Sequence, residues 1–300
     1  MGLMRSARFI YAASLSALVL GFAAQAAAQQ SPTSATHESS ARPDVEKLIS
    51  DSGADVSIAF RSLDGGQELM IHADRSFRDS VAMKLPIMIE LFAQAQAREL
   101  RLTDTIRVHT IFRSLVDNSA YTIDPTSGDD LASDSGQWMS LRQLCELMIT
   151  RDSDIAANLL IERLGFESIQ DRIHRLGADG MVLASGFGDA AAVAKGLRNA
   201  TTPRALMTIL LALAHNQVVD EGASQEMIGI LARSRLPGSI AYNPASPAAR
   251  IRTPSGDVHD ADIVFGARSF VLVIDVRGLS DPQATAALVG QIAHLLAAAI

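Results

Sequence analysis

The sequence predicts an α+β fold in which one antiparallel sheet, flanked by N- and C-terminal helices, carries an inserted all-helical lobe. Segments with a hydrophobic period of two, typical of strands, occur near both ends of the 300-residue chain. The middle of the chain has helical periodicity, so the strands from the two ends must meet in one sheet. We therefore expect one domain over residues 43–300, with its sheet from 43–76 and 250–300 and its helical lobe at about 77–249.

The first 28 residues have the features of a secretory signal peptide. Arg5 and Arg8 form a charged region, an apolar run follows, and both Ala24-Gln25-Ala26 and Ala26-Ala27-Ala28 fit a small-x-small cleavage site. The apolar run is short and ends in small residues, which favours cleavage over retention as a membrane anchor. We expect a periplasmic or secreted protein without a membrane span after cleavage, and a disordered leader at 29–42.

The composition argues against nucleic acid as a partner and against an internal disulfide. The chain has 26 basic and 33 acidic residues, a net charge of −7, and loss of the two signal arginines lowers this charge to −9. Such an acidic chain repels a phosphate backbone and an anionic membrane. Cys145 is the only cysteine, and its helical apolar context, LRQLCELMI, predicts a position in the core.

The elements of the sheet region follow from periodicity and turn signals. The N-terminal strands should form a hairpin, because Asp64-Gly65-Gly66 between them is a turn sequence. The terminal segment is apolar and rich in alanine, which favours a helix. The predicted elements are a helix at Pro43–Ser52, strands at Val56–Arg61, Glu68–His72, Asp262–Phe265 and Ser269–Val276, and a helix at Pro282–Ile300.

The stretch Phe77–Phe92, FRDSVAMKLPIMIELF, predicts a central helix that is buried on most sides, because its apolar residues are too many for one stripe. Pro86 is compatible with a helix only near the N-terminus, so we expect the helix to begin close to Ser80. Lys84 then lies in its first turns. An unpaired buried ammonium is costly, so Lys84 must find an anion or face a cleft.

Further helices of the lobe are predicted from apolar periodicity and from capping residues. Ser140 and Thr202 are good N-caps, and Pro203 suits a first helical position. The loop Tyr121–Gln137 is rich in aspartate, but its spacing does not match an EF-hand, so we expect a solvated loop. The predicted helices are Ser140–Thr150, Ile155–Leu164, Ser168–Leu176, a helix starting at Pro203, and Glu221–Arg233.

The central stretch resembles the class A β-lactamases and their serine-hydrolase relatives. In that family a nucleophilic serine opens the central helix in an S-x-x-K motif, and an apolar run follows. Lys84 matches the motif lysine, but Val81 stands at the nucleophile position and Ser80 lies one residue too early. The resemblance covers nearly all of 45–300 and implies the same layout of sheet and helical lobe, without a cofactor or a metal.

A second segment, LCELMITRDSDIAANLLIERLG, resembles the family segment that holds the second motif. The run Asn158-Leu159-Leu160 sets the register. The motif serine, which relays a proton in the family, then falls on Asp152, and the asparagine that binds the substrate amide falls on Asp154. A carboxylate cannot donate a hydrogen bond as an amide does, and it repels an anionic substrate.

Two further segments resemble family motifs with altered residues. In VLASGFGDAAAVAKGLRNATTP, Gly188 falls where many relatives carry the glutamate that activates the deacylating water, and the neighbouring Asp189 is the carboxylate available. In ARIRTPSGDVHDADIVFG, Arg252-Thr253-Pro254 occupies the K-T-G positions. Arg252 keeps the charge, whereas Pro254 removes a backbone N–H from a strand that must pair with the substrate.

These changes predict an exported β-lactamase-like protein with a degenerate active site, which binds or scaffolds in the cell envelope. Its partner would be a cell-wall or peptide-like small ligand. One alternative is a working serine hydrolase with Ser80 as nucleophile and Lys84 as base, since positions i and i+4 share a helix face. The other is a cation site made by Asp152, Asp154 and Asp189.

The same register predicts an electrostatic pairing. In the family, the positions of Lys84, Asp152 and Arg252 are neighbours in one cleft. A carboxylate at Asp152 therefore lies where a neutral serine separates two cations in an active enzyme. We expect Asp152 to form an ion pair with Lys84, with Arg252 or with both.

Overall fold

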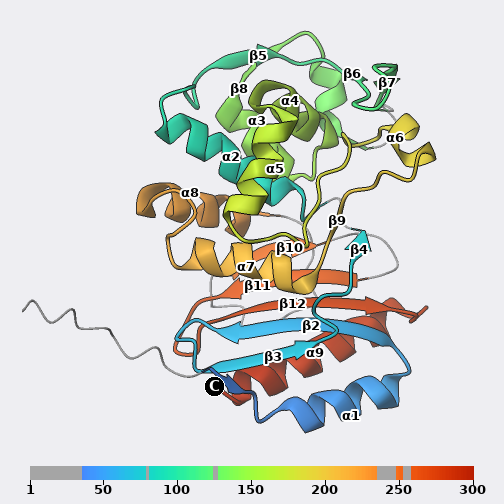
Figure 1. Cartoon of the computed structure of the whole chain (residues 1–300), viewed down its shortest axis with the longest axis vertical. Helices are drawn as coiled ribbons and strands as arrows, with labels where there is room; N and C mark the ends of the chain where they lie inside the picture. Colours follow the sequence, from blue (N-terminus) through green and yellow to red (C-terminus); the bar gives the residue numbers. More distant parts are fainter. Residues whose placement is uncertain (1–35, 79–80, 124–127, 235–247, 253–257) are drawn as a thin grey trace, which may run out of the picture. The chain divides into compact units, whose positions relative to one another are not determined.

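A six-stranded sheet with helices on both faces forms the frame of the fold (Figure 1). The computed structural model describes residues 36–78, 81–123, 128–234, 248–252 and 258–300, all within one compact unit. The strand order is β1-β3-β2-β12-β11-β10, and all neighbours are antiparallel except β1 and β3. The strands are β1 (His37–Glu38), β2 (Asp55–Ser62), β3 (Gln67–Ile71), β10 (Ala248–Arg252), β11 (Val258–Val264) and β12 (Phe270–Arg277).

The α+β class and the strands predicted at both chain ends are confirmed. One correction concerns the predicted leader at 29–42, because its last residues are ordered. His37 and Glu38 pair with β3, and α1 begins at Arg42. A two-residue strand is too short to show a period of two, so sequence periodicity did not indicate it.

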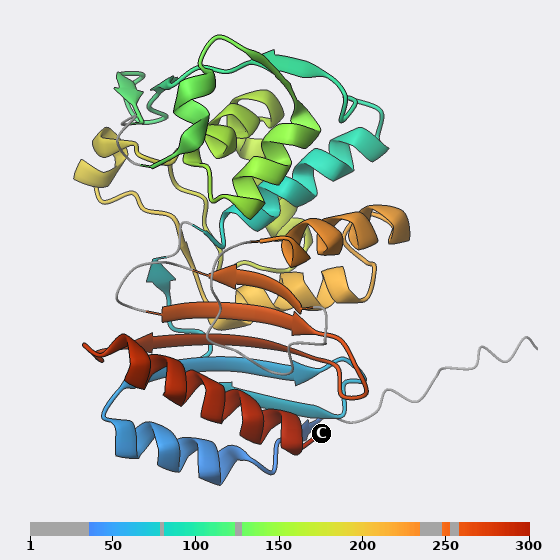
Figure 2. The ribbon, with the colours of Figure 1, turned by 180° about the vertical axis from the view of Figure 1, so that it is seen from behind.

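Both faces of the sheet are buried, which follows from the period of two along β12. Phe270, Leu272 and Ile274 belong to a core shared with α1 (Arg42–Ser52) and α9 (Pro282–Ala298). Val271 and Val273 belong to the core on the opposite face, where α7 packs. Figure 2 shows α1 and α9 together against one face of the sheet.

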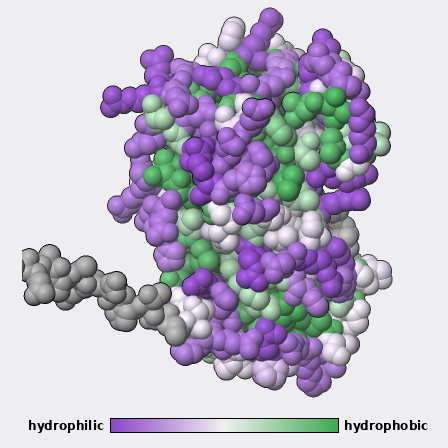
Figure 3. All heavy atoms as spheres, viewed as in Figure 1, coloured by the Kyte–Doolittle hydropathy of each residue, from purple (hydrophilic) through white to green (hydrophobic). Residues whose placement is uncertain are grey.

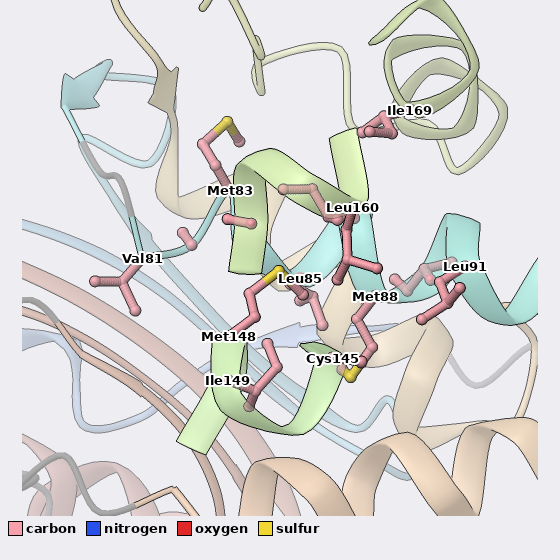
Figure 4. Close-up of a cluster of buried hydrophobic side chains, with 14 of the residues drawn as sticks. Val81, Met83, Leu85, Met88, Leu91, Cys145, Met148, Ile149, Leu160 and Ile169 are labelled. Atoms are coloured by element: carbon pink, nitrogen blue, oxygen red, sulfur yellow. The ribbon is translucent and has the colours of Figure 1, made fainter. Parts of the chain in front are cut away.

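The central helix α2 is buried on nearly all sides, as predicted, but it begins at Lys84 rather than close to Ser80. Val81–Met83 form a turn in which the Lys84 and Leu85 amides donate to the carbonyls three residues earlier. Pro86 then falls at the third helical position, where an amide has no partner inside the helix in any case. Figure 4 shows Leu85, Met88 and Leu91 of α2 among side chains of the neighbouring helices.

The helices predicted in the lobe are confirmed, with Ser140 and Thr202 as N-caps. Cys145 is buried in the core, as expected, and burial raises the pKa of its thiol. No helix of the described residues is long and apolar enough to cross a membrane. The helices of the lobe region are α2 (Lys84–Gln96), α3 (Leu141–Thr150), α4 (Asp154–Leu164), α5 (Phe166–Arg175), α6 (Ala190–Ala194), α7 (Pro203–Ala214) and α8 (Glu221–Ala232).

The lobe is not all-helical, which corrects the prediction. It contains three two-stranded ribbons within the described residues, each made of strands of two or three residues. Figure 3 shows that hydrophilic side chains cover much of the outer face of this region. The ribbons are β4 (Phe77–Arg78) with β9 (Ala200–Thr201), β5 (Thr105–Arg107) with β8 (Trp138–Ser140), and β6 (Ile111–Arg113) with β7 (Ala120–Thr122).

An ion pair between α2 and α5 fixes the middle of the lobe. The Glu90 side chain is 4% exposed, and its Oε2 lies 2.7 Å from Nε of Arg172. Gln94, one turn further along α2, donates to the other carboxylate oxygen at 2.9 Å. Arg172 therefore compensates a carboxylate that is almost entirely removed from water.

We expect Arg172→Ala to lower the free energy of unfolding by about 3–5 kcal/mol, because it leaves the Glu90 charge buried without its cation. Urea unfolding at pH 7 measures this loss. Arg175→Ala, an exposed arginine on the same helix, is the matched control and should change stability little. Equal losses in the two variants would contradict the importance of the pair.

Candidate functional site

The ammonium of Lys84 is the centre of the candidate site. The lysine is 1% exposed, at the first position of α2. Its Nζ lies 2.7 Å from the Asp152 carbonyl oxygen, 2.5 Å from Asp152 Oδ1 and 2.7 Å from Asp154 Oδ1. The two Asp152 oxygens accept hydrogen bonds from the ammonium, and Asp154 forms an ion pair with it. The predicted pairing of Asp152 with Lys84 is confirmed.

The turn between α3 and α4 directs Asp152 onto the lysine with both its backbone and its side chain. Asp152 has a φ of 58°, a left-handed conformation that few residues with a side chain adopt. Aspartate tolerates this conformation better than most residues. Carbonyl and carboxylate of one residue can therefore reach the same ammonium, while Asp154, at the start of α4, supplies the second carboxylate.

Ser153 and Asp129 hold this turn in place. The Ser153 hydroxyl caps α4 by accepting the Ala156 amide at 3.0 Å, and it donates to the Asp129 carboxylate at 2.9 Å. Asp129 also accepts the Ile155 amide at 2.9 Å. The loop predicted to be solvated is therefore attached to the site through Asp129, whereas residues 124–127 lie outside the described residues.

Phe187 is the loop residue that faces Lys84, and no sequence motif indicated it. Its ring centroid lies 5.2 Å from the Lys84 Nζ, a distance suitable for a cation–π contact. The buried Asn158 fixes the loop by donating to the Phe187 carbonyl and accepting the Phe187 amide, each at 2.8 Å. A buried asparagine in an apolar helix needs hydrogen-bond partners. Asn158 in the apolar helix was therefore the feature of the sequence that could have indicated a loop held against it.

Gly188 and Asp189 lie in surroundings that differ from those that the motif alignment implied. Gly188 has a φ of 76°, which suits a residue without a side chain. The buried Asp189 caps α6, because its Oδ1 accepts the Ala192 amide at 3.0 Å. The structure records an aromatic ring beside Lys84 and no contact between Lys84 and Asp189 among the described residues.

The remaining motif positions are described only in part. Val81 is buried in the turn before α2, where its carbonyl accepts the Lys84 amide. Ser80 and Thr253 lie outside the described residues. Arg252 pairs through its backbone with Asp260 in the sheet, but its side chain also lies outside the described part, so its expected pairing with Asp152 stays a prediction.

Burial of the Asp152 carboxylate is energetically unfavourable, and the Lys84 ammonium reduces this cost. Burial raises the pKa of the Asp152 carboxyl above its ordinary value, and nearby Asp154 and Asp129 act in the same direction. The Lys84 ammonium lowers this pKa, but burial and the two neighbouring carboxylates together outweigh it. Removing the lysine would therefore raise the pKa of Asp152 further.

The alternative of a cation site gains no support from the described residues. They include no group of three histidine, cysteine or acidic side chains placed to hold a metal ion. Between Asp152 and Asp154, the place of a cation is taken by the lysine ammonium itself.

We expect Lys84→Met to lower the free energy of unfolding by about 3 kcal/mol at pH 7, the lower end for breaking a buried pair, because Asp152 is one-quarter exposed. The loss should be smaller at pH 4. An Asp with a raised folded-state pKa contributes stability below its unfolded value of about 3.9 and loses it as pH rises through the folded pKa. Without Lys84 the folded-state pKa of Asp152 rises further, so more stability is lost between pH 4 and pH 7.

Urea unfolding at the two pH values measures the effect. Lys47→Met is the matched control, since Lys47 pairs with Asp51 on the surface. The control should lose little stability, to a similar extent at both pH values. A Lys84→Met variant as stable as wild type at pH 7, or a loss that shrinks with rising pH, would contradict this account.

Comparison with known proteins identifies the family and the fold of this chain. The family model described as the β-lactamase enzyme family matches residues 40–300. No curated protein matches the chain. Among solved structures, a β-lactamase from Sphaerobacter thermophilus is 21% identical, with a TM-score of 0.70 over 84% of this chain and 94% of that one.

Two other solved structures have the same fold. PBP-A is 19% identical, with a TM-score of 0.73 over 88% of this chain and 97% of its own. A β-lactamase from Chitinophaga pinensis is 18% identical, with a TM-score of 0.73 over 86% of this chain and 98% of that one. The family match spans most of the sequence and includes every element of the site, so this chain belongs to the β-lactamase enzyme family.

Proposed function

We propose that this chain is an exported, catalytically degenerate member of its family, with a binding or scaffolding role in the cell envelope. The observation that carries the proposal is the state of Lys84. Its ammonium lies within 2.7 Å of three oxygen atoms, two of them from carboxylates, and the lysine is buried from water. This arrangement is that of a structural cation, whereas a general base needs a free lone pair.

The other parts of an acyl-transfer site are also altered. Such a site needs a nucleophile, a base and oxyanion donors together. Val81 offers an aliphatic side chain at the nucleophile position, and Phe187 places a ring without a proton acceptor beside Lys84. The alternative with Ser80 as nucleophile assumed a helix running from Ser80 to Lys84. The described helix α2 begins at Lys84 and Ser80 lies outside the described residues, so the structure gives this alternative no support.

The ligand class is proposed from the fold. A point mutant of PBP-A, which is 19% identical to this chain, was solved as an acyl-enzyme complex with penicillin G. A cell-wall or peptide-like small ligand is therefore the partner that suits a cleft inherited from this fold. The predicted signal peptide at residues 1–28 supports a periplasmic or secreted location, where such ligands occur.

We expect the purified chain to show no mass increase after exposure to penicillin G, because no nucleophile stands at position 81. Intact-protein mass spectrometry measures this directly. The Val81→Ser variant should likewise hydrolyse no β-lactam above background, since Lys84 remains held by Asp152 and Asp154 and since the parts of such a site act as a unit.

Two outcomes would contradict the proposal. A stoichiometric adduct on wild type that disappears in Ser80→Ala would identify a working serine hydrolase. Efficient turnover by Val81→Ser would show that Lys84 is free to act as a base despite its two carboxylates. Val81→Ala is the matched control, because it shortens the side chain as serine does without adding a hydroxyl.

A further inference from the structure

A cavity of about 820 Å³ lies where β4 and the segment before β9 approach the ends of β11 and β12. Three arginines, Arg78, Arg198 and Arg277, line it together with His259 and Phe77. None of the residues that contact the Lys84 ammonium belongs to its lining. A volume of this size suits a small-molecule ligand.

The strand pairing explains how residues far apart in sequence meet at this cavity. Arg78 of β4 lies opposite Ala200 of β9, and Arg198 precedes Ala200 by two residues. Phe77, next to Arg78, stacks on the ring of His259 from β11, with centroids 4.7 Å apart and an interplanar angle of 14°. The stack joins the β4 ribbon to the main sheet.

One wall of the cavity is fixed by a buried carboxylate. Asp275 lies opposite His259 in the sheet, and its Oδ1 is 2.5 Å from the His259 Nδ1. Its Oδ2 is 2.7 Å from Nη2 of Arg277, which follows two residues later on the same face of β12. Each oxygen of Asp275 therefore lies within ion-pair distance of a side chain in this wall.

The other two arginines have no such counter-charge within the part of the chain that the structure describes. Arg78 and Arg198 are exposed, and neither forms an ion pair with any residue that the structure describes. Two guanidinium groups on one cavity without an ion-pair partner among the described residues stand out in a chain with a net charge of −7. Each presents a planar fork of donors that matches a carboxylate or a phosphate.

We propose that this cavity binds a small anion that carries carboxylate or phosphate groups, with Arg78 and Arg198 as its main contacts and Arg277 as a preorganised third one. This inference goes beyond the proposed function, because it concerns residues outside the Lys84 cluster. The overall negative charge of the chain disfavours a nucleic acid as the occupant.

Titration of the full chain with inorganic phosphate, and separately with succinate, tests the proposal at an ionic strength held constant with sodium chloride. Thermal melting should show a saturable rise in Tm with at least one anion, and the anion that binds identifies the group recognised. Arg78→Gln and Arg198→Gln should each raise the apparent Kd about tenfold, as expected for loss of a charge-assisted contact.

Arg175→Gln, which removes an exposed arginine on α5, is the control and should leave the Kd unchanged. The Tm of each variant without anion shows whether it is folded. No rise with either anion, or the same Kd in the two cavity variants and the control, would overturn the proposal. The penicillin experiment does not involve this cavity, so the two proposals can fail separately.

Discussion

The buried ammonium of Lys84 and the carboxylates beside it are the interaction on which the rest of the site depends. Lys84 is the first residue of α2, so it lies at the positive end of the helix dipole, where a cation is unfavourable. Burial adds a desolvation cost. Asp152 and Asp154 offset both the unfavourable helix dipole and the desolvation cost. Asp154 is the first residue of α4, so its own charge is favoured by the dipole of that helix.

The same cluster connects three segments of the chain. Lys84 belongs to α2, Asp152 to the turn before α4, and Phe187 to a loop held by Asn158. A lysine that takes part in acyl transfer must exchange a proton during the reaction, so it needs changing partners. Here the lysine has fixed partners on two elements. On our proposal, the lysine position that takes part in catalysis in active relatives instead stabilises the packing of the lobe in this chain.

The sequence allowed prediction of most helices and strands and of the ion pair in the site, but not of the aromatic contact beside it. Long strands show a hydrophobic period of two, and Ser140 is an N-cap residue that predicts the start of a helix. Strand β1 is too short to show such a pattern. The pairing of Asp152 with Lys84 followed from a register set by a helix. Phe187 was missed because counting along a loop has no such register, and its contact with Lys84 depends on tertiary hydrogen bonds.

A double-mutant cycle between Lys84 and Asp152 tests the central claim most directly. It compares the unfolding free energies at pH 7 of wild type, Lys84→Met, Asp152→Leu and the double variant. Our account predicts a coupling energy of at least about 1 kcal/mol, with the double variant more stable than the sum of the single losses implies. Additive losses, with no coupling, would contradict the claim that Lys84 is a structural cation held by Asp152.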